Sequence, residues 1–284
     1  MRLDSWLAAA CAQLPDSDSA QLDAELLLLK RLNKPRSFVF TWPEHPLDPP
    51  LLAQLEQDLQ RRIRGEPIAH IIGEREFWSL PLQVNASTLI PRPDTESLVE
   101  AALALALPAN ARVVDLGTGT GAIALALKSE MAQWQVQAVE YSAEAAQLAR
   151  TNAKALQLDV TVAQGSWFEP LAQQRFDLIV SNPPYIDPCD QHLSQGDVRF
   201  EPLSALIAAN HGLADIEHIV AAARHHLNDG GYLLIEHGYD QGSAVAAIFT
   251  HAGFNGVTVG QDYGQRDRFT CGQWRGECQI PQKR

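Results

Sequence analysis

From about residue 111 onwards, short apolar segments alternate with segments of helical periodicity, and this alternation constrains the fold more than any other feature. The expected strands are Arg112–Leu116, Val136–Glu140, Val160–Ala163, Phe176–Val180 and Tyr232–Glu236, followed by Gly256–Val259 and Arg268–Cys271 as a closing pair. Helices are expected over residues 122–127, 143–156, 213–227 and 241–252. Strands that alternate with helices form parallel sheets covered on both faces. The sequence therefore predicts an α/β domain that ends in an antiparallel hairpin.

The chain before this region has a different pattern. Residues 1–75 are predicted to be helical, and the third helix starts at Pro49 and has apolar residues at steps of four, namely Leu51, Leu55, Leu59 and Ile63. We predict a small helical bundle over 1–75, an extended link or hairpin over 76–90, and the sheet domain over 91–284. The bundle has no glycine loop or catalytic cluster. It is either a docking domain for a partner or a lid that stabilises the sheet domain.

Composition limits the classes of partner. The 284 residues carry a formal net charge of −12, whereas proteins that hold a long nucleic-acid duplex present a basic face. No apolar run is long enough for a membrane helix, and no signal-peptide pattern precedes Trp6. Histidines and cysteines show no metal-ligand spacing, and no Cys-x-x-Cys pair links Cys11, Cys189, Cys271 and Cys278. These features predict a cytoplasmic protein without metal that acts on a small molecule or a protein.

The expected strand 176–180 stops at Asn182, because Pro183 and Pro184 lack N–H donors and fix φ. Ligands of open α/β sheets bind at such strand ends. The Asn182 side-chain oxygen and a proline carbonyl together can accept both hydrogens of a planar amino group, and Tyr185 adds a flat face and a hydroxyl. The motif predicts a cradle for a carboxamide or a base amine. The alternative is an ordinary turn that ends the strand.

A second polar stretch, Leu89–Ser97, contains two prolines and precedes an apolar helix expected to reach about Leu107. Asp94 or Thr95 is expected to cap this helix. Arg92 lies among carboxylates, so it either faces a ligand or belongs to a solvated capping region. Local sequence does not distinguish these two interpretations.

A glycine loop joins the first strand of the sheet domain to its helix: Gly117, Thr118, Gly119, Thr120 and Gly121. Glycines let backbone approach a ligand, and the following helix N-terminus favours a negative group. Glu140 ends the next strand, where an acidic side chain accepts hydrogen bonds from ribose hydroxyls. The spacing Gly-x-Gly-x-Gly disfavours a pyrophosphate cradle, so S-adenosylmethionine fits better than a dinucleotide. The alternative is a tight turn with a surface glutamate.

An aromatic pair follows the third expected strand, where adenine lies in folds of this kind. Trp167 is the expected adenine contact and Phe168 the expected core residue. Both residues can instead belong to the core.

Two of these motifs resemble those of known enzymes. Asp115–Gly121 resembles motif I of class I S-adenosylmethionine-dependent methyltransferases, and Asn182–Tyr185 resembles the signature of enzymes that methylate amino groups. The stretches 90–96 and 197–203 and the helical N-terminal region are similar to the peptide chain release factor glutamine-N5 methyltransferases, the PrmC/HemK family. The resemblance covers nearly the whole chain and implies a Rossmann-like, seven-stranded sheet.

The resemblance also implies roles for particular residues. Gly117 to Gly121, Glu140, Trp167 and Asn182 would contact S-adenosylmethionine, which becomes S-adenosylhomocysteine. Asn182, Pro183, Pro184 and Tyr185 would hold the glutamine of the release factor's Gly-Gly-Gln motif, with Asn182, Pro183 and Tyr185 as catalytic residues. At one position the chain departs from the family, because Ser166 stands where an aspartate is common.

Two other functions fit part of the pattern. An adenine-N6 DNA methyltransferase shares the Asn-Pro-Pro-Tyr signature but needs a basic face and a domain that reads bases. A nucleoside-binding protein without enzymatic activity would not need that signature beside the glycine loop. The acidic net charge favours a protein substrate over DNA.

Overall fold

The computed structural model describes residues 1–276, and Cys278 lies outside them. The chain divides into two compact units. The helical unit comprises Met1–Glu74 together with His192–Phe200, and the sheet unit comprises Arg75–Gln191 and the chain from Glu201 onwards. Cys11, Cys189 and Cys271 are free thiols. None of the helices in the described residues is long and apolar enough to cross a membrane.

The helical unit contains five helices, which are α1 (Leu3–Ala12), α2 (Ala20–Leu32), α3 (Ser37–Thr41), α4 (Pro49–Ile63) and α5 (Ile68–Ile72). Leucines from α1, α2 and α4 form its core. The Asp48 side chain accepts a hydrogen bond from Leu51 N at 2.9 Å and thereby caps α4. Segment 192–200 contains the short 3₁₀ helices η3 (Gln191–Ser194) and η4 (Gly196–Phe200). Its Asp197 pairs with Arg62 at 3.5 Å, so this segment packs with the helices.

The sheet unit contains a seven-stranded sheet of order β5-β4-β3-β6-β7-β9-β8. The strands are β3 (Arg112–Leu116), β4 (Gln135–Glu140), β5 (Val160–Gln164), β6 (Phe176–Ser181), β7 (Leu227–Glu236), β8 (Asn255–Gln261) and β9 (Asp267–Gln273). The pairs among β3 to β7 are parallel, and β9 pairs antiparallel with both β7 and β8. The predicted mostly parallel sheet with a closing hairpin is confirmed. A separate two-stranded sheet, β1 (Glu74–Phe77) and β2 (Leu80–Gln83), precedes it.

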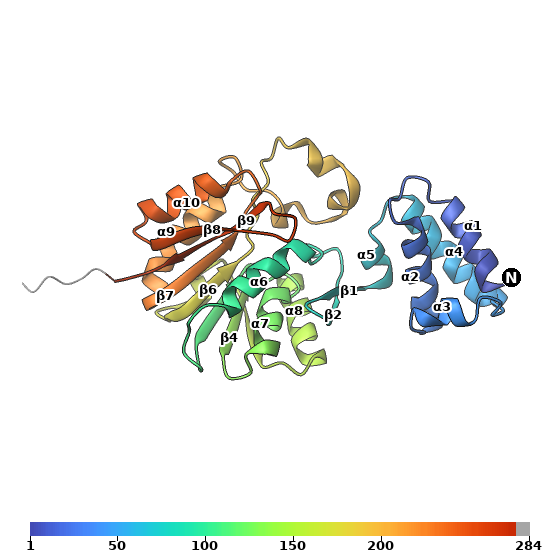
Figure 1. The fold of residues 1–284 in the computed structure, drawn as a ribbon, viewed down its shortest axis with the longest axis horizontal. Helices are drawn as coiled ribbons and strands as arrows, with labels where there is room; N and C mark the ends of the chain where they lie inside the picture. Colours follow the sequence, from blue (N-terminus) through green and yellow to red (C-terminus); the bar gives the residue numbers. More distant parts are fainter. Residues whose placement is uncertain (277–284) are drawn as a thin grey trace, which may run out of the picture. The chain divides into compact units, whose positions relative to one another are not determined.

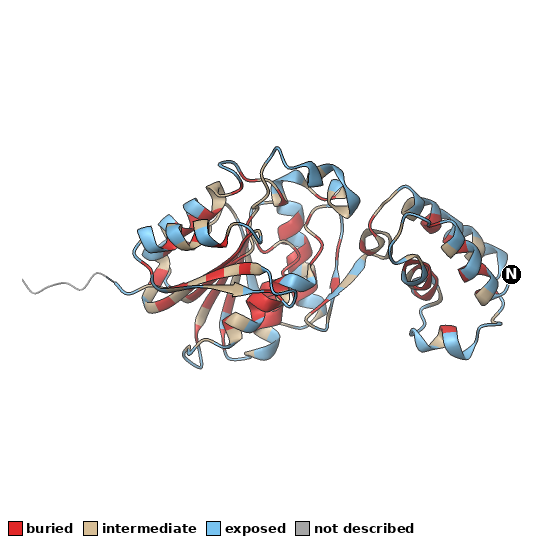
Figure 2. Ribbon diagram, turned by 45° about the horizontal axis from the view of Figure 1, so that its top comes forward, coloured by how far each residue is buried: buried red, intermediate tan, exposed pale blue. Residues whose placement is uncertain are grey.

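Helices cover both faces of this sheet (Figure 1). One face packs against α6 (Glu96–Leu103), α7 (Ala122–Glu130) and α8 (Ala143–Ala155), and the other against α9 (Ala214–His226) and α10 (Gly242–His251). Alternation along the strands supplies both cores: Val113 and Leu178 face the first set, whereas Val114 and Ile179 face the second. Buried residues accordingly line the sheet on both sides in Figure 2.

Two boundaries differ from the prediction by about four residues or more. Helix α6 ends at Leu103 instead of about 107, because the N–H of Leu105 bonds to Ala102 O three residues back and the α-helical ladder stops there. Strand β7 begins at Leu227 instead of residue 232 and contains Gly230 and Gly231, which were expected to form a turn. The register between β6 and β7 shifts at this point, so the glycines lie in an irregular stretch of strand.

Candidate functional site

A cavity of about 350 Å³ lies in the sheet unit at the carboxyl ends of β3, β4 and β6. Its size lies within the range of small-molecule sites. Most of the residues predicted for cofactor binding line it, namely Gly117, Thr118, Gly119, Thr120, Glu140, Trp167 and Asn182. Pro184 lines it as well. Sequence positions far apart along the chain therefore meet at one edge of the sheet, as open α/β sheets require.

The glycine loop joins β3 to α7 at the floor of this cavity. The N–H groups of Gly117 and Thr118 donate to the carbonyl oxygen of Val139 at 2.8 and 3.0 Å, which ties the loop to β4. Gly119 has a φ of +56°, and a Cβ there would have no neighbour closer than 3.9 Å, so its backbone borders open space. Gly121 does not line the cavity, and a Cβ there would meet Leu125 at 3.0 Å. A glycine at position 121 therefore allows α7 to pack closely against the loop.

Glu140 lies at the end of β4 and holds the loop. One carboxylate oxygen accepts from Gly119 N at 2.9 Å, and the other accepts from Ser142 N at 2.9 Å. The side chain is half-buried and borders the cavity. Each carboxylate oxygen keeps further acceptor capacity, so the group is suited to receive hydroxyl donors.

Asp115 is buried at the end of β3, directly behind the loop. One oxygen accepts from the Thr118 hydroxyl at 2.5 Å and from Ala124 N at 3.2 Å, while Oδ1 has no hydrogen-bond partner among the described residues. Burial, opposed by those hydrogen bonds and helped by the negative charge of Glu140, raises the pKa of Asp115 to about 7.

The two aromatic residues after β5 occupy different environments: Trp167 borders the cavity, and Phe168 lies in the core. Trp167 lines the cavity, and its ring lies 3.2 Å from the place that a Cβ on Gly117 would occupy. Its φ of +46° is unusual for a bulky residue, and such strained conformations concentrate at functional sites. Phe168 is buried and stacks on His226 with ring centroids 4.5 Å apart. Ser166 also borders the cavity.

Asn182 follows β6 and borders the cavity together with Thr95. Its Nδ2 donates to Thr95 Oγ1 at 3.3 Å. Of the two predicted caps, Thr95 takes the N-cap position of α6, but its side chain makes no capping hydrogen bond and its hydroxyl serves this contact instead. Pro183 is buried, and neither Pro183 nor Tyr185 lines the cavity. The Tyr185 hydroxyl donates to Glu236 Oε1 at 3.3 Å behind it.

Three residues near the cavity were missed by sequence reasoning. Glu201 is buried and accepts from Ile90 N at 2.9 Å and from Arg92 at 2.6 Å, so Arg92 supports a loop through a carboxylate. Thr88 borders the cavity, and its buried hydroxyl has no partner among the described residues. Glu236, at the end of β7, was read only as a strand residue. The usable signal was an acidic residue at the end of an otherwise apolar strand.

No group of three or more metal-ligating side chains suitable for a metal ion occurs within residues 1–276. Burial lowers the pKa of His237, whose ring nitrogens are occupied by Gly238 O and the Thr270 hydroxyl at 2.9 Å each. This histidine makes structural contacts next to Glu236 in the chain. The polar groups around the cavity include carboxylates, amides, hydroxyls and the Arg92 guanidinium.

The sheet order and the strand-end cavity define a class I methyltransferase-like domain, and solved structures share this fold. A methyltransferase from Pyrococcus furiosus superposes with a TM-score of 0.55 at 17% identity, over 77% of this chain and 98% of that one. The 16S rRNA N2 G1207 methyltransferase of Thermus thermophilus, solved with AdoMet and guanosine, gives a TM-score of 0.50 at 17% identity, over 71% and 50%. Family models named PrmC N-terminal domain and Methyltransferase small domain match residues 5–73 and 95–197.

Much closer similarity links the chain to one family. It is 56% identical to the release factor glutamine methyltransferase of Vibrio cholerae, over 97% of this chain and 98% of that protein. It is 54% identical to that of Pseudomonas aeruginosa (93% and 96%) and 50% identical to that of Escherichia coli (96% and 99%). The chain belongs to the release factor glutamine methyltransferase family and is a methyltransferase.

Proposed function

We propose that this enzyme transfers the methyl group of S-adenosylmethionine to the N5 amide nitrogen of the glutamine in the Gly-Gly-Gln motif of peptide chain release factors. One observation carries the proposal: in a chain with this family membership, Asn182 borders the same cavity as Glu140 and the glycine loop. The proposed amide acceptor, Asn182, and the proposed nucleoside site, Glu140 with the glycine loop, thus line one cavity. The acidic net charge of −12 supports a protein acceptor over DNA.

The residues around the cavity fit S-adenosylmethionine. Glu140, Trp167 and Ser166 line the cavity. In this proposal Glu140 accepts from the ribose hydroxyls and the Trp167 ring stacks on adenine, with the Ser166 hydroxyl nearby. The open space above Gly119 and the unpartnered hydroxyl of Thr88 suit the polar amino-acid end. A ligand that donates to or accepts from Thr88 removes the cost of leaving that buried group without a partner.

The glutamine amide is a poor nucleophile, because its lone pair is delocalised into the carbonyl group. When bound, the sulfonium supplies an electrophilic methyl group. Asn182 Oδ1 and the Pro183 carbonyl are proposed to accept hydrogen bonds from the two N–H groups of the amide, while Pro184 and Tyr185 shape the cradle. Positive charge develops on the nitrogen as it attacks, so fixed acceptors stabilise the transition state more than the ground state. Holding the reacting atoms in line lowers the barrier further.

The test is single-turnover methylation of a purified release factor at saturating labelled S-adenosylmethionine. The wild-type chain should label the factor, and a factor in which the motif glutamine is replaced by alanine should stay unlabelled. Asn182→Ala should lower the rate about 10²–10³-fold, the typical cost of losing one preorganised stabilising group. A rate within threefold of wild type would remove Asn182 from the mechanism, and labelling of DNA but not of the factor would overturn the proposed substrate.

We also propose that the helical unit is a partner-recognition domain for the release factor. Phe40 and Trp42 on and after α3 leave 70% and 60% of their surface exposed, and exposed aromatic residues are typical anchors of protein interfaces. The double variant Phe40→Ser, Trp42→Ser should raise KM for the full-length factor. The matched readout is a short Gly-Gly-Gln peptide, whose methylation should not change. Equal KM values for the factor would contradict this role.

A further inference from the structure

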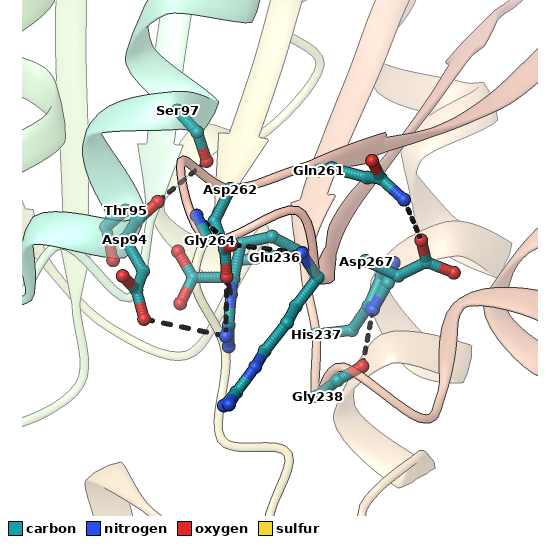
Figure 3. A network of polar contacts seen from close by, with 12 residues as sticks. Asp94, Thr95, Ser97, Glu236, His237, Gly238, Gln261, Asp262, Gly264 and Asp267 are labelled. Atoms are coloured by element: carbon teal, nitrogen blue, oxygen red, sulfur yellow. Dashed lines mark hydrogen bonds and ion pairs between the residues drawn. The ribbon is translucent and has the colours of Figure 1, made fainter.

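A buried carboxylate lies behind the proposed amide cradle. Glu236 ends β7 and is 1% exposed. Its Oε1 accepts from the Tyr185 hydroxyl at 3.3 Å, whereas Oε2 has no hydrogen-bond partner among residues 1–276. Figure 3 shows it beside Asp94 and Thr95, which belong to the short 3₁₀ helix η1 (Pro93–Thr95). The cavity itself is not lined by Glu236. It is therefore placed to act through its neighbours and not on a ligand directly.

Thr95 connects this carboxylate to Asn182. The Thr95 side chain is buried, borders the cavity and lies beside Glu236 (Figure 3), and it is one of the groups that lower the pKa of that carboxyl group. Its oxygen also accepts from Asn182 Nδ2. A hydroxyl has one hydrogen to donate and two lone pairs, so both interactions are satisfied together only when the hydrogen points to Glu236.

The charge state of Glu236 decides the direction of hydrogen-bond donation along the series Glu236, Thr95 and Asn182. An ionised carboxylate only accepts hydrogen bonds, so Thr95 must donate to it and must then accept from Asn182. The Asn182 NH₂ group is thereby held against Thr95, and Oδ1 is the end left for a substrate. A protonated Glu236 can donate to Thr95 instead, and the orientation of the Asn182 amide is then no longer fixed.

We propose that Glu236 is a positioning residue that acts through the Thr95 hydroxyl to orient the Asn182 amide with Oδ1 toward the substrate nitrogen. This inference rests on the proposed function, in which Asn182 receives the amide to be methylated. It adds two residues to the machinery, one of which lies outside the cavity. No bond is made or broken on either residue.

The groups that face Glu236 make its ionisation sensitive to pH near neutrality. Burial raises its pKa to about 7, opposed by the neighbouring Thr95 hydroxyl, by the positive charge of Arg268 on β9 and by the hydrogen bond from Tyr185. Asp94 adds a negative charge that raises it. Arg268 itself pairs with Asp262 at 2.9 Å and with Asp94 at 3.5 Å, so its charge is shared. The catalytic rate should therefore rise with pH as Glu236 loses its proton.

The experiment measures kcat and KM of the full-length enzyme on a purified release factor between pH 6 and 9. Glu236→Gln and Thr95→Val should each lower kcat at pH 8 about tenfold, the cost of one misdirected hydrogen bond, with KM for S-adenosylmethionine within about twofold of wild type. Glu236→Gln should also lose the rise of kcat near pH 7. Thr95→Ser keeps the hydroxyl and should be several-fold faster than Thr95→Val. Asp177→Asn, at the opposite end of β6, is the matched control and should keep the wild-type pH profile.

The outcomes separate this inference from the proposed function. A wild-type enzyme that does not label the factor overturns both. An active wild type, with Glu236→Gln matching it in kcat and pH profile, overturns this inference alone. A measurement on the unmodified enzyme guards against unfolded variants: the Asn182 side-chain amide resonances, assigned by their absence in Asn182→Asp, should titrate with a midpoint near pH 7. Resonances that do not move between pH 6 and 8 also overturn it.

Discussion

The helical unit and the sheet unit both bury carboxylates, but they give them different partners. In the helical unit each buried carboxylate accepts from an arginine at 2.6–2.9 Å, and the pairs are Asp23–Arg62, Glu25–Arg36 and Asp58–Arg31. In the sheet unit, Asp115 and Glu236 are buried without a direct salt bridge, and each has one oxygen lacking a partner in the described part of the chain. The pKa of each is raised to about 7.

This difference distinguishes carboxylates that stabilise helix packing from carboxylates that belong to a functional site. A buried carboxylate with a bound arginine is compensated and fixes how helices pack. One without such a partner costs stability, and perturbed carboxyl groups beside a cavity are typical of functional sites. Glu201 shows that the distinction is not simply one between units, because it lies in the sheet unit yet pairs with Arg92 and supports a loop.

The largest expected effect is on the pH dependence of stability. Asp115 has a folded-state pKa of about 7 against an ordinary 3.8, so the folded state holds its proton more tightly. Its contribution is fully present below pH 4 and is lost as pH rises through about 7. Relative to Asp115→Asn, the wild type should lose on the order of 4 kcal/mol in free energy of unfolding between pH 4 and 8. Urea denaturation at both pH values measures this, and an unchanged difference would contradict it.

Removing the arginine partner of a buried carboxylate should lower stability by slightly less. Arg62→Met leaves Asp23 buried without its arginine, and we expect a loss of about 3 kcal/mol in the opening free energy of α2 and α4. Hydrogen–deuterium exchange of the backbone amides in these two helices measures this opening free energy for the helical unit alone. Lys30→Met removes an exposed 3.6 Å pair with Glu74 and is the matched control. Equal exchange in both variants would mean that the buried pair contributes no more than the surface one.

An accessible carboxylate should affect binding instead of folding. Glu140 has exposed acceptor capacity toward the cavity, so Glu140→Ala should weaken S-adenosylmethionine binding by about 1.5–3 kcal/mol, or roughly tenfold to a hundredfold. Isothermal titration calorimetry measures the change, and thermal unfolding checks the fold. Undiminished affinity in a folded variant would exclude Glu140 from the cofactor site.

The smallest effect should come from an ion pair at the solvent-exposed surface. Arg2 contacts Asp4 at 2.6 Å and Glu44 at 3.0 Å on the surface of the helical unit. Solvent screens such pairs, so Asp4→Asn should leave the urea midpoint unchanged within error. A clear shift of the midpoint would show that exposure alone does not decide how much a carboxylate contributes.

Much of the architecture could be predicted from local pattern. Strand β3 has its predicted bounds, and most other elements of the sheet lie within a few residues of them, because burial of a parallel strand requires an unbroken apolar run. Predicted boundaries were wrong where pairing with a distant strand sets the true boundary. Strand β7, for example, extends through Gly230 and Gly231 and pairs with β6. The segment 192–200 could not be placed, because its contacts with Arg62 come from a distant part of the chain.

The sequence by itself determined the chemistry that the chain carries: the glycine loop, the acid at the end of the second strand of the sheet domain, and Asn182 held by two prolines. These depend on backbone conformations and residue types that neighbouring residues dictate. Only the tertiary structure decided which groups stand behind them. Thr95, on a 3₁₀ helix distant in sequence, contacts Asn182. Glu236 contacts Tyr185 because the sheet order sets β7 beside β6. The protonation of Glu236 likewise follows from burial, which is a property of the packed fold and not of any local stretch.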